Sequence, residues 1–146
     1  MKNRDNILEV RFPSLSRNES LARSLVSSFL MNLDPTVAEV ADIKCAVSEA
    51  VTNAIVHGYR ESCGTVFMRF ESSSDGVVQI EIRDKGCGIP DVMRAMEPLF
   101  TTDPEGERSG MGFTVMESFC DKVRVVSREG RGTKVVLTKK LSKKDL

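Results

Sequence analysis

Residues 37–58 have the sequence VAEVADIKCAVSEAVTNAIVHG, and this stretch decides how most of the chain is arranged. Apolar residues recur along it at three- and four-residue spacing, which predicts a long amphipathic helix that runs to His57. Gly58 follows directly, at the position where a glycine commonly ends a helix. The apolar positions are Val37, Val40, Ala41, Ala46, Val47, Ala50, Val51, Ala54 and Ile55.

The segment before this helix predicts a strand and a second helix. Residues 7–13, ILEVRFP, alternate apolar and polar side chains and stop at Pro13, which is typical of a strand. Ser16, with Glu19 three residues later, fits a capping box that opens a helix over about 17–32. The face expected to be buried consists of Leu21, Leu25, Phe29 and Leu33.

The second half of the chain predicts two hairpins separated by an irregular segment and a short helix. The polar run SSSDG joins the strands of the first hairpin, and EGRG joins those of the second. The segment 91–110 contains Pro98 and Pro104 and is too broken for a long helix, which is typical of a mobile lid. The expected strands are 65–71, 77–83, 122–128 and 133–139, and the expected helix is 113–121. This order predicts an α+β fold, a two-layer α/β sandwich with a mostly antiparallel sheet covered by helices on one face.

Composition narrows the class of protein. The 146 residues suit a single domain over 1–146, with 40% apolar and 29% charged residues. The start MKNRDNILEVRF lacks the apolar core of a signal peptide, and no apolar run approaches the roughly 20 residues that span a bilayer, so we expect a cytoplasmic protein without a membrane partner. Twenty-one basic residues balance 21 acidic ones, which disfavours direct nucleic-acid binding. The scattered thiols predict reduced cysteines and no zinc site: Cys45, Cys63, Cys87 and Cys120.

Glu49 and Asn53 lie four residues apart on the long helix and therefore share one face. The neutral oxygen of an asparagine suits a hard cation such as Mg²⁺, and a glutamate can polarise a hydroxyl group beside it. A solvated polar face is the competing interpretation, and the spacing alone favours it.

Asp84, Gly86 and Gly88 form the pattern D-x-G-x-G directly after a predicted strand. The glycines permit close approach of the backbone to a flat ligand, and the carboxylate can accept a hydrogen bond from an exocyclic amine. A plain turn explains the same residues, because Asp-x-Gly is common turn chemistry.

The run Arg108-Ser109-Gly110-Met111-Gly112 opens the predicted helix 113–121. Glycines at the start of a helix expose backbone N–H groups to an anion, and an arginine adds a forked cation that suits a phosphate. An ordinary helix start with an incidental arginine is equally consistent with the pattern.

Taken in order, E49-x-x-x-N53-A54-x-x-H57-G58, D84-x-G86-x-G88, G110-x-G112 and G132-T133 resemble the motifs of the GHKL superfamily. That superfamily includes gyrase, a heat-shock chaperone, mismatch-repair MutL and the histidine kinases, and its members carry the Bergerat ATP-binding fold. The runs SEAVTNAIVHGY (48–59), PLFTT (98–102) and ERSGMGFTVME (107–117) are similar to the anti-sigma-F factors of spore-forming bacteria, which are serine kinases.

The resemblance implies a role for each matching position in a Mg-ATP site. Asn53 would hold Mg²⁺ against the phosphates, and Glu49 would be the general base. Asp84 would bind the adenine amine, with Thr133 assisting through a water molecule, and Arg108 would reach the γ-phosphate. The other residues expected to contact the nucleotide are Gly86, Gly88, Thr101, Thr102, Ser109, Gly110, Met111 and Gly112.

The resemblance also implies partners: a sigma factor of the sigma-F type, an anti-anti-sigma factor as the serine substrate, and a second copy in a homodimer. The first helix would contact both protein partners through Arg17, Glu19 and Arg23. Three alternatives stay open, namely a kinase for a stress sigma factor, an ATP-gated binding module without transfer activity, and a detached histidine-kinase catalytic domain. Glu49 argues against the second alternative. The missing phosphoacceptor domain and the runs PLFTT and ERSGMGF argue against the third.

Overall fold

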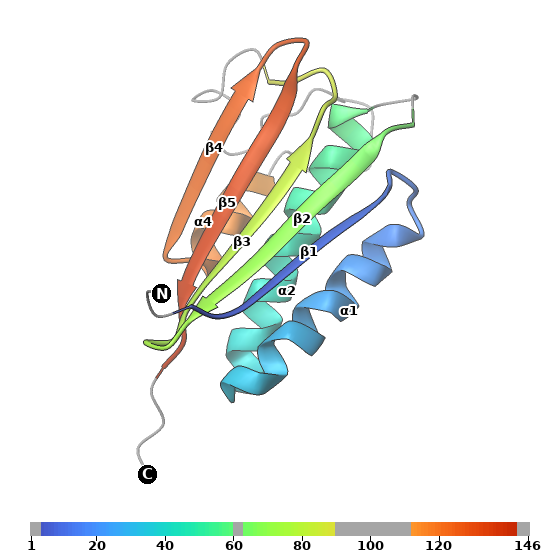
Figure 1. The fold of residues 1–146 in the computed structure, drawn as a ribbon. Helices are drawn as coiled ribbons and strands as arrows, with labels where there is room; N and C mark the ends of the chain where they lie inside the picture. Colours follow the sequence, from blue (N-terminus) through green and yellow to red (C-terminus); the bar gives the residue numbers. More distant parts are fainter. Residues whose placement is uncertain (1–3, 60–62, 90–111, 143–146) are drawn as a thin grey trace.

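The computed structural model describes residues 4–59, 63–89 and 112–142, and these residues form two layers (Figure 1). One layer is a five-stranded sheet in the order β1-β2-β3-β5-β4, in which all neighbouring strands are antiparallel. Its strands are β1 (Arg4–Pro13), β2 (Thr65–Ser73), β3 (Val77–Asp84), β4 (Lys122–Arg128) and β5 (Gly132–Lys140). The predicted α+β sandwich is therefore confirmed, with strand bounds that differ by at most three residues.

The other layer consists of helices that lie on one face of the sheet (Figure 1). They are α1 (Asn18–Leu30), the 3-10 helix η1 (Met31–Leu33), α2 (Val37–Thr52), the π-helix η2 (Asn53–Gly58) and α4 (Gly112–Phe119). Helix α2 packs against both α1 and α4, so it is the central helix, as its sequence predicts.

The first helix differs from its prediction in two ways. The N-cap residue is Arg17 rather than Ser16, and no side chain caps the helix. Leu21 is 44% exposed, so the predicted buried face is rotated. The positions that are buried follow the helical repeat and begin with a small side chain, which allows close approach to α2: Ala22, Val26, Phe29 and Leu30.

The central helix begins with a capping box that its sequence prediction missed. Thr36 Oγ1 accepts a hydrogen bond from the Glu39 N–H at 3.0 Å, and Glu39 Oε1 accepts one from the Thr36 N–H at 2.8 Å. The predicted single helix over 37–57 is also wrong at its end, because the chain changes to a π-helix at Asn53. Gly58 is the last residue of that π-helix, and the residue after it, Tyr59, has right-handed backbone angles, so Gly58 is not a left-handed cap.

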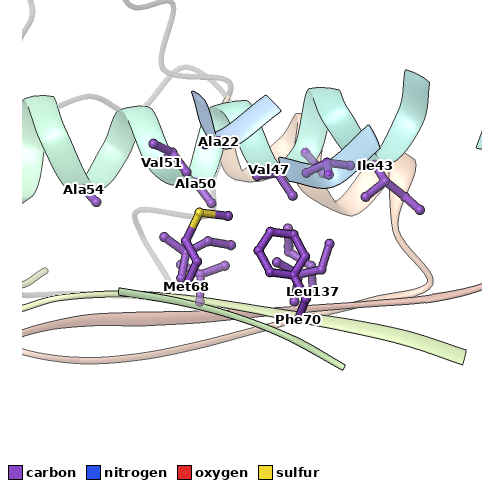
Figure 2. Packing of buried hydrophobic residues seen from close by; sticks show 14 of the residues in the cluster. Ala22, Ile43, Val47, Ala50, Val51, Ala54, Met68, Phe70 and Leu137 are labelled. Carbon is purple, nitrogen blue, oxygen red and sulfur yellow. The ribbon is translucent and has the colours of Figure 1, made fainter. Parts of the chain in front are cut away.

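The core lies between α2 and the helix-covered face of the sheet, as Figure 2 shows. Val47 and Ala50 of α2 point toward Met68 and Phe70 of β2 and Leu137 of β5, and all five are at most 2% exposed (Figure 2). Burial of each of the larger side chains (Val47, Met68, Phe70 and Leu137) contributes roughly 1.5–3 kcal/mol to the stability of the fold. This packing fixes the position of α2 and, with it, the position of the polar residues at its C-terminal end.

Candidate functional site

The residues singled out by sequence gather at one end of the sandwich. The C-terminal end of α2, the segment after β3 and the turn between β4 and β5 lie at the same end of the molecule (Figure 1). A π-helical turn ends the central helix there, and such turns frequently occur at functional sites because they displace one residue from the regular helical repeat.

Glu49 and Asn53 meet the first residue of α4. A Cβ atom added to Gly112 would lie 3.3 Å from Oε2 of Glu49 and 3.3 Å from Nδ2 of Asn53. Both side chains are half-buried, and neither forms a side-chain hydrogen bond within the described part of the chain. The absent side chain at Gly112 therefore lets the start of α4 approach a carboxylate and a carboxamide that form no side-chain hydrogen bond with the described residues.

Asp84 is the last residue of β3 and is 6% exposed. Its Oδ1 accepts a hydrogen bond from the Gly86 N–H at 2.9 Å. Burial raises the pKa of this carboxyl above its ordinary value, and backbone hydrogen bonds from Gly86 and Thr133 oppose that shift without cancelling it. A buried carboxylate held by backbone donors is a well-oriented acceptor for a neutral amine.

Two glycines allow the end of η2 to touch the loop that follows β3. A Cβ atom on Gly86 would lie 2.0 Å from the carbonyl oxygen of Gly58, and one on Gly58 would lie 2.9 Å from Cγ of Asp84. The Cys87 N–H donates to the same Gly58 carbonyl at 2.7 Å, and the Cys87 thiol donates to the carbonyl of His57 at 3.1 Å. Gly58 is thus required for packing against the carboxylate rather than for helix termination.

The same loop packs on the turn between β4 and β5. Gly88 has a φ of 76°, and a Cβ atom there would lie 2.0 Å from the carbonyl oxygen of Arg128. The Gly130 N–H donates to the carbonyl of Cys87 at 2.6 Å. Gly132 has a φ of 115°, and its Cβ atom would lie 2.2 Å from the backbone of Asp84. These backbone contacts fix the loop from both sides.

Ser127 of β4 is a residue of the site that the sequence reasoning missed. Its hydroxyl accepts from the Ile89 N–H at 2.7 Å and lies 2.7 Å from Oγ1 of Thr133. Ser127 is directly opposite Thr133 in the hairpin. Two hydroxyl residues at facing positions of a predicted hairpin are the signal that would have found it. Ser127 therefore orients the hydroxyl of Thr133 and holds the end of the loop.

The three residues expected to contact protein partners lie on the first turns of α1. Arg17 is exposed, whereas Arg23 is half-buried and donates to Oγ of Ser48 at 3.4 Å. Glu19 accepts a hydrogen bond from the hydroxyl of Thr52. The two partners, Ser48 and Thr52, belong to α2, and they directly precede Glu49 and Asn53 in the sequence. The expected docking helix is thus in direct contact with the part of α2 that precedes Glu49 and Asn53.

Several predictions lie outside the described residues. They are the lid expected over 91–110 and the residues Thr101, Thr102, Arg108, Ser109, Gly110 and Met111. Within residues 4–59, 63–89 and 112–142, no three His, Cys, Asp or Glu side chains form a metal cluster. In the same ranges, none of the helices has the length and hydropathy needed to cross a membrane.

Comparison with known proteins agrees with this geometry. Residues 12–139 match the model of the histidine kinase-like ATPase domain. The anti-sigma F factor of Clostridium acetobutylicum is 51% identical over 138 residues, which cover 94% of this chain and 96% of that protein. The anti-sigma F factor of Bacillus subtilis strain 168 is 54% identical over 139 residues, covering 94% of both. The chain belongs to the anti-sigma F factor family of histidine kinase-like ATPase domains.

Solved structures show the same fold at lower identity. The RsbU and RsbW domains of a Mycobacterium tuberculosis protein superpose with a TM-score of 0.70 at 22% identity, over 95% of this chain and 33% of that one. Full-length ShkA, crystallised in complex with AMPPNP, superposes with a TM-score of 0.61 at 18% identity, over 88% of this chain and 31% of that one. The family membership implies an ATP-binding domain of the kinase type.

Proposed function

We propose that this chain binds and inhibits a sigma factor of the sigma-F type, and that it phosphorylates and inactivates an anti-anti-sigma factor with Mg-ATP. The observation that carries the kinase part is the convergence of Glu49, Asn53 and the start of α4 at Gly112. The sigma-binding part rests on the anti-sigma F factors to which more than nine tenths of the chain is aligned.

Glu49 is the general base of the proposed transfer to a serine of the partner. It takes the proton from the attacking hydroxyl, whose oxygen forms a bond to the γ-phosphorus. The bond between that phosphorus and the bridging oxygen breaks at the same step, and ADP leaves with the electron pair. Glu49 then releases its proton to solvent. The half-buried position of its carboxylate suits this role, because it keeps access to an incoming hydroxyl.

Asn53 supplies the protein ligand for Mg²⁺ in this proposal. The carboxamide beside Gly112 presents a neutral oxygen of the kind that a hard cation prefers. When bound, Mg²⁺ neutralises phosphate charge and orients the phosphates. A single protein oxygen plus phosphate oxygens is the usual arrangement for this ion, so the donor set fits without a cluster of carboxylates.

The adenine end of the site is the loop after β3. Asp84 accepts the exocyclic amine, Thr133 assists through a water molecule, and Gly86 and Gly88 leave room for the base. We propose that Thr101, Thr102, Arg108 and residues 109–112 complete the phosphate side. The proposed protein is a cytoplasmic homodimer of single-domain chains, as the resemblance to anti-sigma-F factors implies, and sedimentation of the purified chain tests its stoichiometry.

Arg23 is the proposed main contact of α1 with the protein partners. A guanidinium makes forked contacts with acidic groups, and arginine is frequent among the residues that dominate binding. We expect Arg23→Ala to lose at least about 2 kcal/mol of affinity for the sigma factor, measured by calorimetry, while ATP affinity is unchanged. Arg11→Ala, at an exposed arginine of β1, is the matched control. Full affinity in a folded Arg23→Ala would place the docking surface elsewhere.

One experiment tests the whole proposal. The chain is mixed with Mg-ATP labelled in the γ-phosphate, a candidate anti-anti-sigma factor and a sigma-F-type sigma factor, and the label is mapped. Label on a serine of the partner supports the proposal. Nucleotide-dependent capture of the sigma factor without any label identifies a binding module, and tighter capture of a stress sigma factor identifies the sibling kinase.

A further inference from the structure

Tyr59 joins three segments of the site through one hydroxyl group. It is the only tyrosine in the chain, it follows η2 directly, and it is 9% exposed. Its hydroxyl accepts a hydrogen bond from the Lys85 N–H at 2.8 Å and donates one to the carbonyl of Thr65 at 2.7 Å. The end of the central helix, the loop after β3 and the start of β2 are therefore bonded to one atom.

The ring of Tyr59 is held as firmly as its hydroxyl. A Cβ atom on Gly64 would lie 2.1 Å from Cε1 of the ring, so the glycine leaves the space that the ring fills. The Tyr59 N–H donates to the carbonyl of Ala54 at 3.1 Å and closes the last turn of the π-helix. A side chain fixed at both ends and on one face has a single orientation, and its hydroxyl is a fixed reference point for the loop.

We propose that Tyr59 is a positioning residue for adenine, which acts by fixing the direction of the Asp84 carboxylate. Lys85 directly follows Asp84, so the bond from the Lys85 N–H to the phenol sets the backbone direction at the carboxylate. Asp84 Oδ1 is bonded to the Gly86 N–H, one residue further on. Two consecutive N–H groups of the loop are thus held, one by a phenol and the next by a carboxylate. This inference rests on the proposed nucleotide site.

Removing the hydroxyl leaves two part-buried backbone groups, the Lys85 N–H and the Thr65 carbonyl, without this partner. Such groups are costly to leave unpaired, so the loop in Tyr59→Phe is expected to shift toward other donors and acceptors. The carboxylate then loses its preset direction, and nucleotide binding must reorder the loop. Because the phenol is bonded to the loop that would hold adenine, a part that ATP and ADP share, the affinities for ATP and ADP should weaken by the same factor. The transfer rate at saturating ATP should be unchanged.

The test is calorimetry of Tyr59→Phe with Mg-ATP and with Mg-ADP, together with steady-state phosphotransfer. We expect both dissociation constants and KM for ATP to rise roughly 5- to 30-fold, with kcat unchanged. Ser14→Ala is the matched control, because Oγ of Ser14 accepts from the Gly64 N–H at 2.8 Å at the same start of β2 but does not touch the loop. That control should lose stability and keep its nucleotide affinity.

Three outcomes separate the possibilities. Wild-type affinity in folded Tyr59→Phe, or an equal loss in Ser14→Ala, overturns the positioning role. A wild-type chain that binds no ATP overturns the proposed function itself. If Tyr59→Phe does not fold, the wild-type chain labelled with 3-fluorotyrosine gives a single ¹⁹F signal, because there is one tyrosine. That signal should shift on ADP binding with the calorimetric Kd, and a signal that saturating ADP leaves unmoved contradicts the proposal.

Discussion

The two ends of α2 each carry a glutamate, and the two carboxylates have different surroundings. At the N-terminal end, Glu39 accepts hydrogen bonds from the Thr36 N–H at 2.8 Å and from the Ser142 N–H at 2.6 Å. Nearby, Asp121 accepts from the Lys140 N–H at 2.6 Å. Glu39 therefore connects the start of α2 to the segment after β5, and Asp121 connects the segment after α4 to the end of β5.

At the C-terminal end, Glu49 faces Gly112 and forms no hydrogen bond with the described residues. The two glutamates share a helix, a residue type and partial burial, yet Glu39 accepts two backbone hydrogen bonds and Glu49 accepts none from the described residues. Hydrogen bonds to neighbouring backbone therefore distinguish the two carboxylates, where position on an amphipathic helix does not.

The largest effect that this comparison predicts is on phosphotransfer. Glu49→Gln should keep ATP affinity and slow transfer about 10²–10⁴-fold, because a general base acts in the transition state. The matched substitution on the same helix, Glu39→Gln, should transfer phosphate at the wild-type rate. Single-turnover transfer with labelled ATP measures both. A normal rate in Glu49→Gln would place the base elsewhere, and an equal loss in Glu39→Gln would remove the distinction between the two ends.

A smaller effect is expected on nucleotide affinity. Asp84→Ala removes the proposed acceptor of the adenine amine, and the loss of a hydrogen bond to a charged group costs about 1.5–3 kcal/mol, or roughly 10- to 150-fold in Kd. Titration calorimetry with Mg-ATP measures it. Asp121→Ala, at the opposite end of the molecule, is the control. Equal ATP affinity in wild type and Asp84→Ala would defeat the assignment of this carboxylate.

The sequence was sufficient for the elements that local pattern controls. The strand pairs on either side of SSSDG and EGRG, the central helix as far as Thr52 and the layer arrangement agree with the structure. The described residues that match the family motifs lie close together in the structure, because each motif falls at the end of a helix or strand. Local periodicity and turn chemistry determine these features with little help from tertiary contacts.

Capping is where the sequence was insufficient. The pattern S/T-x-x-E precedes both α1 and α2, at Ser16–Glu19 and at Thr36–Glu39, and of these two only the second forms a capping box. The first fails because the Glu19 carboxylate bonds to Thr52 of another helix. A pattern within four residues cannot show that competition. Gly58 was misassigned for a related reason, since its function is contact with Asp84, which is 26 positions away.

The smallest expected effect is on the pH dependence of stability, and it has opposite signs for Glu39 and Asp84. Burial acts to raise the pKa of Glu39, but hydrogen bonds from Thr36 and Ser142 together lower it below its ordinary 4.5. The ionised form is thus favoured by folding, so its stabilisation is present above pH 4.5 and is lost as pH falls through the lowered pKa. Burial raises the pKa of Asp84 above 3.8, so its ionised form opposes folding. That cost is absent below pH 3.8 and is complete above the raised pKa.

Glu39→Gln should therefore lower the Tm of the nucleotide-free protein at pH 7, and Asp84→Asn should raise it. Both differences from wild type should shrink as the pH falls toward 3.5, because Asp84 is by then losing its charge in both states and Glu39 is approaching its lowered pKa. Thermal unfolding between pH 3.5 and 7 measures the two curves. Each amide removes the charge and keeps one acceptor oxygen, so Glu39→Gln also loses one of the two backbone hydrogen bonds that the carboxylate accepts. If both substitutions changed Tm in the same direction, the charges of Glu39 and Asp84 would not have opposite effects on stability.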